Sequence, residues 1–411
     1  MTQAACGVPF ANAEIVPEAQ EAAVNVLRSG WITMGARTAE FEQKLASYLG
    51  ARHVVAVASC TAAIEIALRA LRLGRGAAVL TPSLTFCGAV APIVQAGLRP
   101  VLVDVDAETF LPTPATVARA ARRAGRPAAM IIQHMAGHPA NVPELAAAAG
   151  LPASAVVEDA AHGLGAELGV TRLGGASRAA CFSFYATKNL PIGEGGAIAT
   201  DDDELDEYVR TARLHGLSRD AWRRYLPGGS WRYDVAEPGL KANMTDVQAA
   251  IGVEQLVMLP RWQERRTQLA AQYDAALAGV PGLALPSRPA DGRHAWHLYQ
   301  VRVTGACGIS RDAVIDALTA RAIGTSVHFI PVHQLSGYRR VLGPEECRSV
   351  PVTDQIAQEL LSLPMYPALA DADVTRVAEA LRDVIGPGAE ARGGLSSEGG
   401  EHGELARLSA S

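Results

Sequence analysis

The chain has 411 residues, of which 49% are hydrophobic, and it carries a formal net charge of −5 at pH 7. A chain of this length can bury a large core and is expected to divide into about two domains. The slightly acidic balance, without a block of basic residues, argues against binding to nucleic acid or to an anionic membrane surface.

The six cysteines are scattered without a CxxC pair, which excludes a zinc knuckle or a disulfide framework as the organising feature of the fold. Residues 1–7 lack the basic start and long apolar core of a secretory signal. No later run of about 18 uncharged apolar residues predicts a membrane-spanning helix. We therefore expect a protein of the reducing cytoplasm.

The first half of the chain has the pattern of an α/β protein. Helical periodicity at 15–28 and 38–49 precedes alternating strands and helices, which is typical of βαβ units. The pattern predicts a mostly parallel seven-stranded sheet that is covered by helices on both faces. Its strands are expected at 54–58, 77–80, 100–104, 129–134, 155–158, 179–185 and 196–200.

The second half predicts a smaller α+β domain. Residues 203–258 are expected to be mostly helical, with an irregular loop at 226–231 that contacts the substrate or a partner subunit. A charged amphipathic helix at 261–273 then precedes a strand at 297–303 and helices near 311–321 and 371–385. The predicted divisions are a large domain at 1–260, a small domain at 261–388 and a disordered tail, rich in Gly, Ser and Glu, at 389–411.

Residues 54–68 predict a strand, a tight turn and a helix. The backbone amides of Thr61, Ala62 and Ala63 are expected to be free at the start of this helix, where the helix dipole and unpaired donors favour an anion. The turn could therefore hold a phosphate. Ser and Thr also cap helices for structural reasons alone, so this turn does not by itself establish a binding site.

The strand at 155–158 delivers Asp159 and His162 at its carboxyl end. Ligands of open α/β sheets collect at that edge. An acid placed there can keep the nitrogen of a pyridine ring protonated, which is a recognisable part of sites for pyridoxal phosphate (PLP).

Lys188 follows another apolar stretch, just before a Gly-Glu-Gly-Gly loop at 193–196. An amine held away from water loses its charge more easily and can form a Schiff base with a carbonyl. Lysines at strand ends more often extend to solvent, so the case for a PLP lysine depends on Asp159 and on the turn at Thr61. Tyr185, within the same stretch, is expected to be part of the core.

The chain resembles the DegT/StrS-type PLP-dependent sugar aminotransferases, of the fold-type I aspartate aminotransferase superfamily. Ordered motifs run from about residue 7 to about residue 385. The segments that carry the likeness are 29–35, 40–42, 81–86, 101–106, 133–138, 158–162, 182–189, 193–196, 214–216, 239–252 and 327–329.

The resemblance implies a role for individual residues. Lys188 would form the Schiff base with the cofactor and then move the proton between cofactor and substrate carbons. Asp159 would pair with the pyridine nitrogen, His162 would lie against the ring or its phenolic oxygen, and Phe86 would stack on its face. Ser183, with Thr61 and Ala62, would bind the phosphate.

The resemblance also implies a homodimer with a shared active site, because Lys241 and Asn243 would reach the phosphate held by the neighbouring subunit. Trp31, Thr33 and His328 are candidate substrate contacts, with loop packing as the alternative for His328. One departure from many relatives is Cys60, which stands where they have Gly, so a positive φ at this position would be costly.

The predicted activity is transfer of an amino group from L-glutamate to a nucleotide-linked keto-sugar. The stretch Asn243 to Gly252 resembles the branch that aminates C4 of 4-keto-6-deoxy sugars, which favours dTDP-4-keto-6-deoxyglucose. Amination at C3 or of a keto-inositol in natural-product biosynthesis is the alternative. A non-catalytic regulator that binds PLP or a sugar is a further alternative, and Lys188 and Asp159 argue against it.

No metal is expected. His134 and His138 flank Gly137, but no third ligand is suitably spaced, and a structural role or one near the cofactor is preferred.

Overall fold

The computed structural model describes residues 7–217, 232–235 and 237–385. The predicted loop at 226–231 and the predicted disordered tail at 389–411 lie outside these residues.

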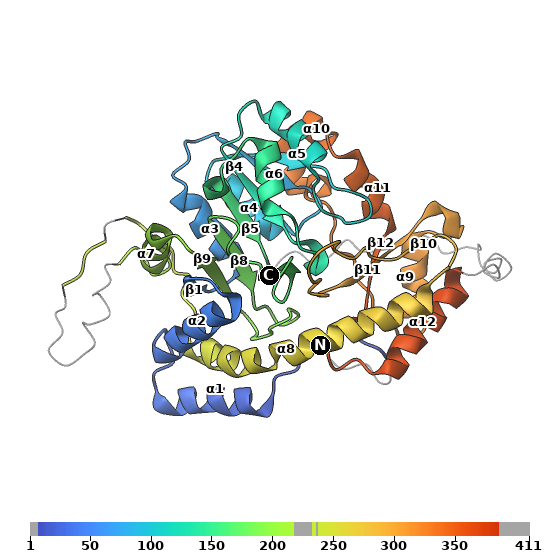
Figure 1. The fold of residues 1–411 in the computed structure, drawn as a ribbon, viewed down its shortest axis with the longest axis horizontal. Helices are drawn as coiled ribbons and strands as arrows, with labels where there is room; N and C mark the ends of the chain where they lie inside the picture. The colour runs from blue at the N-terminus through green and yellow to red at the C-terminus, as the bar shows by residue number, and fades with distance from the viewer. Residues whose placement is uncertain (1–6, 218–231, 236, 386–411) are drawn as a thin grey trace, which may run out of the picture.

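A seven-stranded sheet forms the centre of the protein (Figure 1). Its spatial order is β1-β9-β8-β5-β4-β2-β3, and only β9 runs antiparallel to its neighbours. The prediction of a mostly parallel sheet of seven strands is confirmed, with strand ends that differ by one or two residues. The strands are β1 (His53–Val57), β2 (Ala78–Pro82), β3 (Arg99–Val103), β4 (Ala129–Gln133), β5 (Val156–Asp159), β8 (Ala179–Ser183) and β9 (Gly196–Thr200).

Helices cover both faces of this sheet, which is why its strands are continuous apolar runs. In β1, Val55 and Val57 pack into one core cluster, while Val54 and Ala56 pack into another on the opposite face. The helices of this part are α1 (Pro17–Ser29), α2 (Ala36–Leu49), α3 (Cys60–Ala70), α4 (Cys87–Gln95), α5 (Pro114–Ala124), α6 (Val142–Ala149) and α7 (Asp203–Ala212). A short hairpin, β6 (Glu167–Leu168) with β7 (Thr171–Arg172), lies between β5 and β8 in the sequence.

Helix α8 (Asp246–Leu277) joins the large sheet to the rest of the chain. It begins with a capping box between Thr245 and Gln248, and it packs against α1, α2 and α12 (Figure 1). The helix continues through Pro260, so it crosses the domain boundary predicted at 260 without ending. The exact division into domains remains a prediction.

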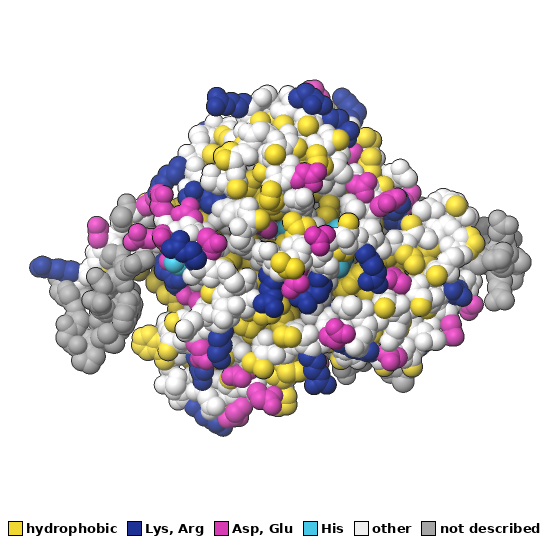
Figure 2. All heavy atoms as spheres, viewed as in Figure 1, with side chains coloured by type: hydrophobic (Ala, Val, Ile, Leu, Met, Phe, Trp, Pro, Cys, Tyr) yellow, Lys and Arg dark blue, Asp and Glu magenta, His cyan; other side chains and the backbone are white. Residues whose placement is uncertain are grey.

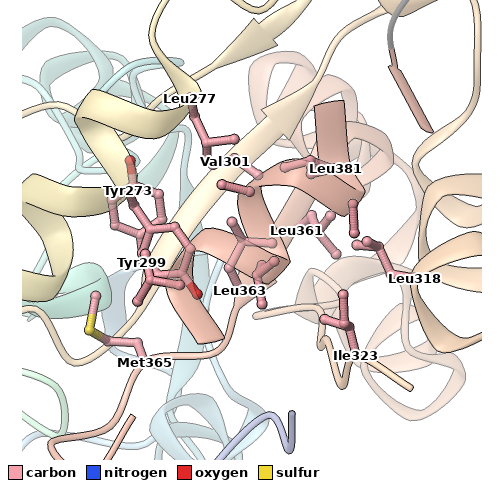
Figure 3. Close-up of a cluster of buried hydrophobic side chains, with 14 of the residues drawn as sticks. Tyr273, Leu277, Tyr299, Val301, Leu318, Ile323, Leu361, Leu363, Met365 and Leu381 are labelled. Carbon is pink, nitrogen blue, oxygen red and sulfur yellow. The ribbon is translucent and has the colours of Figure 1, made fainter. Parts of the chain in front are cut away.

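A second, three-stranded antiparallel sheet has the order β10-β11-β12. Its core packs against α8, where the stacked rings of Tyr273 and Tyr299 lie beside Leu277, Val301 and Leu363 (Figure 3). The remaining elements are β10 (Leu283–Ala284), β11 (Tyr299–Val303), α9 (Arg311–Thr319), α10 (Ser336–Cys347), α11 (Pro351–Glu359), β12 (Leu360–Leu363) and α12 (Asp371–Ile385).

The face of the molecule in Figure 2 shows basic and acidic side chains interspersed over its whole extent. Among the residues that the structure describes, no helix is long and apolar enough to cross a membrane. The five described cysteines, at positions 60, 87, 181, 307 and 347, are free thiols.

Candidate active site

A cavity of about 470 Å³ opens at the carboxyl ends of the parallel strands, where ligands of such sheets collect. Strands β4, β5 and β8 end at its wall, and the first turn of α3 and the segments at 297–298 and 328–329 complete it. The polar and aromatic residues that line it are Phe10, Ser59, Cys60, Thr61, Phe86, Gln133, Asp159, His162, Ser183, Tyr185, Thr187, Lys188, Glu194, His297, His328 and Phe329.

Lys188 lies in the loop that follows β8 and lines the cavity. Burial lowers the pKa of Lys188 to about 8, and the nearby Asp159 partly opposes this shift. About a tenth of the amine is therefore uncharged at pH 7, far more than for an ordinary lysine, and the uncharged form is the nucleophile. The strand itself ends earlier than predicted, at Ser183. Tyr185 is 47% exposed and lines the cavity, so the expectation that it belongs to the core was wrong.

Asp159 is the last residue of β5 and is 4% exposed. Its Oδ1 accepts a hydrogen bond from the backbone nitrogen of Ala161 at 3.1 Å and lies 3.7 Å from the Cys60 Sγ. Burial raises the pKa of Asp159, while the Ala161 amide and Lys188 lower it. A buried carboxylate with an incomplete set of donors is well placed to pair with a cationic ligand group.

The turn before α3 differs from prediction in one respect. Ser59 caps the helix: its Oγ accepts from the Ala62 nitrogen at 3.1 Å, and its carbonyl oxygen accepts from the Ala63 nitrogen at 3.0 Å. The amides of Ala62 and Ala63 are thus not free, because the cap satisfies them. Thr61 lines the cavity, whereas Ala62 is not among the lining residues.

Cys60 fits this turn without strain. It is the first residue of α3 and is not among the residues with positive φ. The conformational cost that a positive φ would impose on Cys60 is therefore absent. The close approach is made instead by Gly196, where an added Cβ would lie 2.4 Å from the Ser59 carbonyl carbon and 2.6 Å from the Cys60 nitrogen. The glycine of the 193–196 loop therefore lets β9 start directly against the turn.

Three histidines line the cavity together with Lys188, and burial lowers the pKa of each. His162 Nδ1 accepts a hydrogen bond from the Ala136 nitrogen at 3.2 Å, which leaves Nε2 as the protonated nitrogen of the neutral ring. His328 Nδ1 lies 3.0 Å from the Ser362 Oγ, and its pKa is lowered to about 4. His297 is the third, with its ring centroid 4.3 Å from that of His162.

Phe86 and Phe329 form an aromatic wall of the cavity. Their ring centroids are 5.7 Å apart, and Phe86 is 56% exposed. Phe329 also stacks on His162, with centroids 5.7 Å apart and planes at 25°. A large aromatic face that is open to a cavity can cover a planar ligand ring.

The family model of the DegT/DnrJ/EryC1/StrS aminotransferase family matches residues 13–382, nearly the whole chain. The chain belongs to this family. The predicted family, fold class and PLP-dependent aminotransferase activity are therefore confirmed. The family and the solved structures that this chain is similar to support the activity of a sugar aminotransferase.

The chain matches individual relatives over nearly their full length. The spore coat polysaccharide biosynthesis protein SpsC of Bacillus subtilis is 40% identical over 92% of this chain and 97% of its own. The putative sugar aminotransferase Spr1654 of Streptococcus pneumoniae, solved in its PMP form, has a TM-score of 0.84 and 29% identity over 92% of this chain and 99% of its own. DesI, solved with its TDP-sugar product, has a TM-score of 0.81 and 31% identity over 94% of each chain.

The cavity of this aminotransferase fits PLP. The Oε1 of Gln133 is buried on the cavity wall and lacks a hydrogen-bond partner in the described structure, so it can accept one from a ligand. Lys188 supplies the amine and Asp159 the buried carboxylate. Thr61 and Ser183 supply polar groups beside the start of α3, where a phosphate would meet the positive end of the helix.

Besides Ala62, four predicted site residues do not line this cavity. Trp31 and Thr33 are exposed; Trp31 Nε1 donates to the Met34 carbonyl oxygen at 3.3 Å. Lys241 Nζ donates to the Asn243 Oδ1, and neither residue lines the cavity. Their segment runs beside the end of β1, where Asn243 pairs with Val57.

His134 has a structural role of the kind preferred from the sequence. Its Nε2 lies 2.9 Å from the Glu158 Oε2, and its Nδ1 accepts from the Ala140 nitrogen at 3.0 Å. Both side chains are fully buried. Within the described ranges, no group of three or more His, Cys, Asp or Glu residues could hold a metal ion.

The sequence analysis missed His297, Gln133 and Phe329 as cavity residues. Gln133 follows the β4 apolar run and could have been found from its place at the carboxyl edge, beside Asp159 in the parallel register. His297 comes just before β11, and only the tertiary fold brings this segment to the cavity.

Proposed function

We propose that the enzyme transfers an amino group from L-glutamate to C4 of dTDP-4-keto-6-deoxyglucose, giving a dTDP-4-amino-4,6-dideoxy sugar. The observation that carries the amino transfer is the shared cavity of the Lys188 amine and the buried Asp159 carboxylate. The nucleotide is supported by DesI, whose structure contains its TDP-sugar product. The C4 position is supported by the likeness of residues 243–252 to the C4-specific branch.

The residues of this chain have separable roles in the proposal. When bound, PLP supplies a ring that withdraws electrons from the carbon bearing the amino group. Lys188 Nζ binds the cofactor covalently and, once released, moves a proton between the reacting carbons. Asp159 holds a proton on the pyridine nitrogen. His162 and Phe86 would contact the ring, and Phe329, which stacks on His162, would add an apolar wall beside it.

The phosphate site is proposed to be completed by a second subunit. Thr61 and Ser183 of one subunit would bind the phosphate together with Lys241 and Asn243 of the other, whereas the Ala62 amide is already occupied by the Ser59 cap. This arrangement accounts for the position of Lys241 and Asn243 outside the cavity of their own chain.

Exposed apolar side chains support such a homodimer. Leu27, Trp31 and Ile32, at the end of α1 and just after it, are 57%, 47% and 53% exposed, and Val257 on α8 is 69% exposed. Trp31 and Thr33 would then contact the substrate from the partner's side, while His328 would do so within one chain. The free thiols of the described residues support a cytoplasmic location.

The experiment that tests this function starts with the visible absorbance of the purified protein after addition of PLP. L-glutamate is then added, followed by dTDP-4-keto-6-deoxyglucose, and the product is analysed by NMR. We expect a band of lysine-bound cofactor that bleaches with glutamate, returns with the sugar and yields a 4-amino product. Bleaching without return would contradict the proposed acceptor and direct the search to 3-keto-sugars and keto-inositols. A protein that forms no band would contradict the site assignment.

A further inference from the structure

The side chain of Asn189 has one possible orientation in this structure. Its Nδ2 donates to two backbone carbonyl oxygens, that of Leu164 at 3.1 Å and that of Ala295 at 2.9 Å. Because carbonyl oxygens only accept, the amide nitrogen must face them and the amide oxygen must face away. Both Asn189 and its neighbour His297 are 5% exposed, so solvent does not offer an alternative partner.

This orientation fixes the tautomer of His297. The Asn189 Oδ1 lies 3.2 Å from the His297 Nδ1 and can only accept, so the hydrogen of the neutral imidazole must be on Nδ1. The other ring nitrogen, Nε2, then carries a lone pair. That lone pair faces the Lys188 Nζ, which lies 3.5 Å away. The contact is longer than a fully formed hydrogen bond, and the flexible lysine side chain allows it to shorten.

The surroundings of His297 keep its ring neutral. Burial lowers its pKa most, and the other groups that lower it are Lys188, His162, Arg266 and His328. Arg266 Nη1 donates to the His297 carbonyl oxygen at 3.3 Å, and the His162 ring packs against its face. Among the described contacts of His297 there is no carboxylate, so nothing favours a second proton on the ring.

We propose that His297 is a positioning residue for Lys188: its Nε2 accepts a hydrogen bond from the lysine amine and so aims that amine at the cavity and stabilises its protonated form. The role rests on the proposed function of Lys188. It applies to the stage at which the amine is free and must hold a proton beside the substrate. The relay Asn189–His297–Lys188 links a buried amide to the reactive amine through one imidazole of defined tautomer.

Loss of the His297 ring nitrogens should change the pKa of Lys188 in one direction. Without an acceptor at Nε2, the ammonium form of Lys188 loses a partner while its burial is unchanged, so its pKa falls further below the ordinary value. We expect His297→Phe to lower the pKa of Lys188 by about one unit, since a hydrogen bond to a charged group has roughly that worth.

The test measures Lys188 in the full-length, cofactor-free protein. Acetylation by acetic anhydride is followed from pH 6 to 11 by mass spectrometry of the peptide that contains Lys188. His294→Phe is the matched control, because His294 is equally buried and lies three residues away, and it does not line the cavity. We expect an unchanged midpoint for this control and a lower one for His297→Phe, with the midpoint restored toward wild type in His297→Gln, whose amide oxygen can accept.

A wild-type midpoint in His297→Phe would overturn the inference. Circular dichroism checks that each variant folds, and His297→Leu takes the place of the Phe variant if the latter does not. Binding of PLP to the wild type, followed by its visible band, tests the proposed function separately: a wild type without the band contradicts that function, whereas a normal band with unchanged midpoints in the variants contradicts only the role of His297.

Discussion

The Asp246 Oδ1 accepts two hydrogen bonds from Thr38, one from its backbone nitrogen at 2.9 Å and one from its hydroxyl at 2.7 Å. The same carboxylate accepts from the backbone nitrogens of Gly35 at 2.7 Å and Arg37 at 3.2 Å. Asp246 is the first residue of α8, yet it caps the start of α2, a helix more than 200 residues earlier in the chain. It therefore joins two segments that the sequence analysis singled out separately.

Replacing Asp246 should destabilise the protein. Asp246→Ala leaves the first amides of α2 without their acceptor in a buried position and removes a charge at the positive end of the helix. We expect the free energy of unfolding to fall by about 2–3 kcal/mol, measured by urea denaturation. Glu21→Ala is the control, because its pair with Arg28 is exposed and should contribute less than about 1 kcal/mol. Equal stabilities of the two variants would show that the cap is unimportant.

Asp159 and Glu158 allow a comparison between neighbours on one strand. Both are buried, but Asp159 lines the cavity while Glu158 binds His134 and Ser177. Asp159→Asn should still bind PLP, yet slow both halves of the reaction by about 10²-fold or more, because a neutral amide cannot hold the ring nitrogen protonated. Glu158→Gln should affect mainly stability. Stopped-flow absorbance with glutamate measures the rates, and equal rates for wild type and Asp159→Asn would remove Asp159 from its role.

The low pKa of Lys188 has a consequence for stability. The pKa is about 8 in the folded protein against 10.5 for an ordinary lysine, so between these values the unfolded chain binds more protons and stability rises with pH. We expect cofactor-free Lys188→Met to be more stable than wild type at pH 7, with the difference shrinking between pH 8 and 10.5. Urea denaturation at several pH values measures it, with Lys44→Met as the exposed control. A difference that does not depend on pH would mean that Lys188 titrates normally.

The sequence was sufficient for the seven strands because each is a short run built around consecutive apolar residues, and β1, β4 and β9 lie within a residue or so of their predicted ranges. It was also sufficient to place Asp159 and Lys188 in one cavity, since parallel strands bring their carboxyl ends to the same edge.

Other features depend on contacts that spacing does not encode. The amide of Ala62 was expected to be free, but whether a cap forms depends on the rotamer of Ser59. Tyr185 was expected in the core because the strand was expected to continue through it, whereas the chain leaves the sheet after Ser183. His297 lies 109 residues from Lys188 in the sequence, and only the tertiary fold brings the segment before β11 to the cavity that Lys188 lines.

The proposed sharing of the active site can be tested with two variants that are each inactive for a different reason. Lys188→Ala removes the amine of its own cavity, and Asn243→Ala removes a phosphate contact that would belong to the partner's cavity. If the two proteins are unfolded, mixed and refolded, each hybrid dimer contains one cavity with both mutations and one with neither. We expect activity to recover to about a quarter of the wild-type value, since half of the dimers are hybrids and half of their sites are intact. If the two variants carry different affinity tags, purification on one tag and then on the other isolates the hybrid dimer. The activity of this hybrid should reach about half of the wild-type value. If Asn243 instead acted within its own chain, every cavity of the hybrid would carry one mutation and activity would not recover.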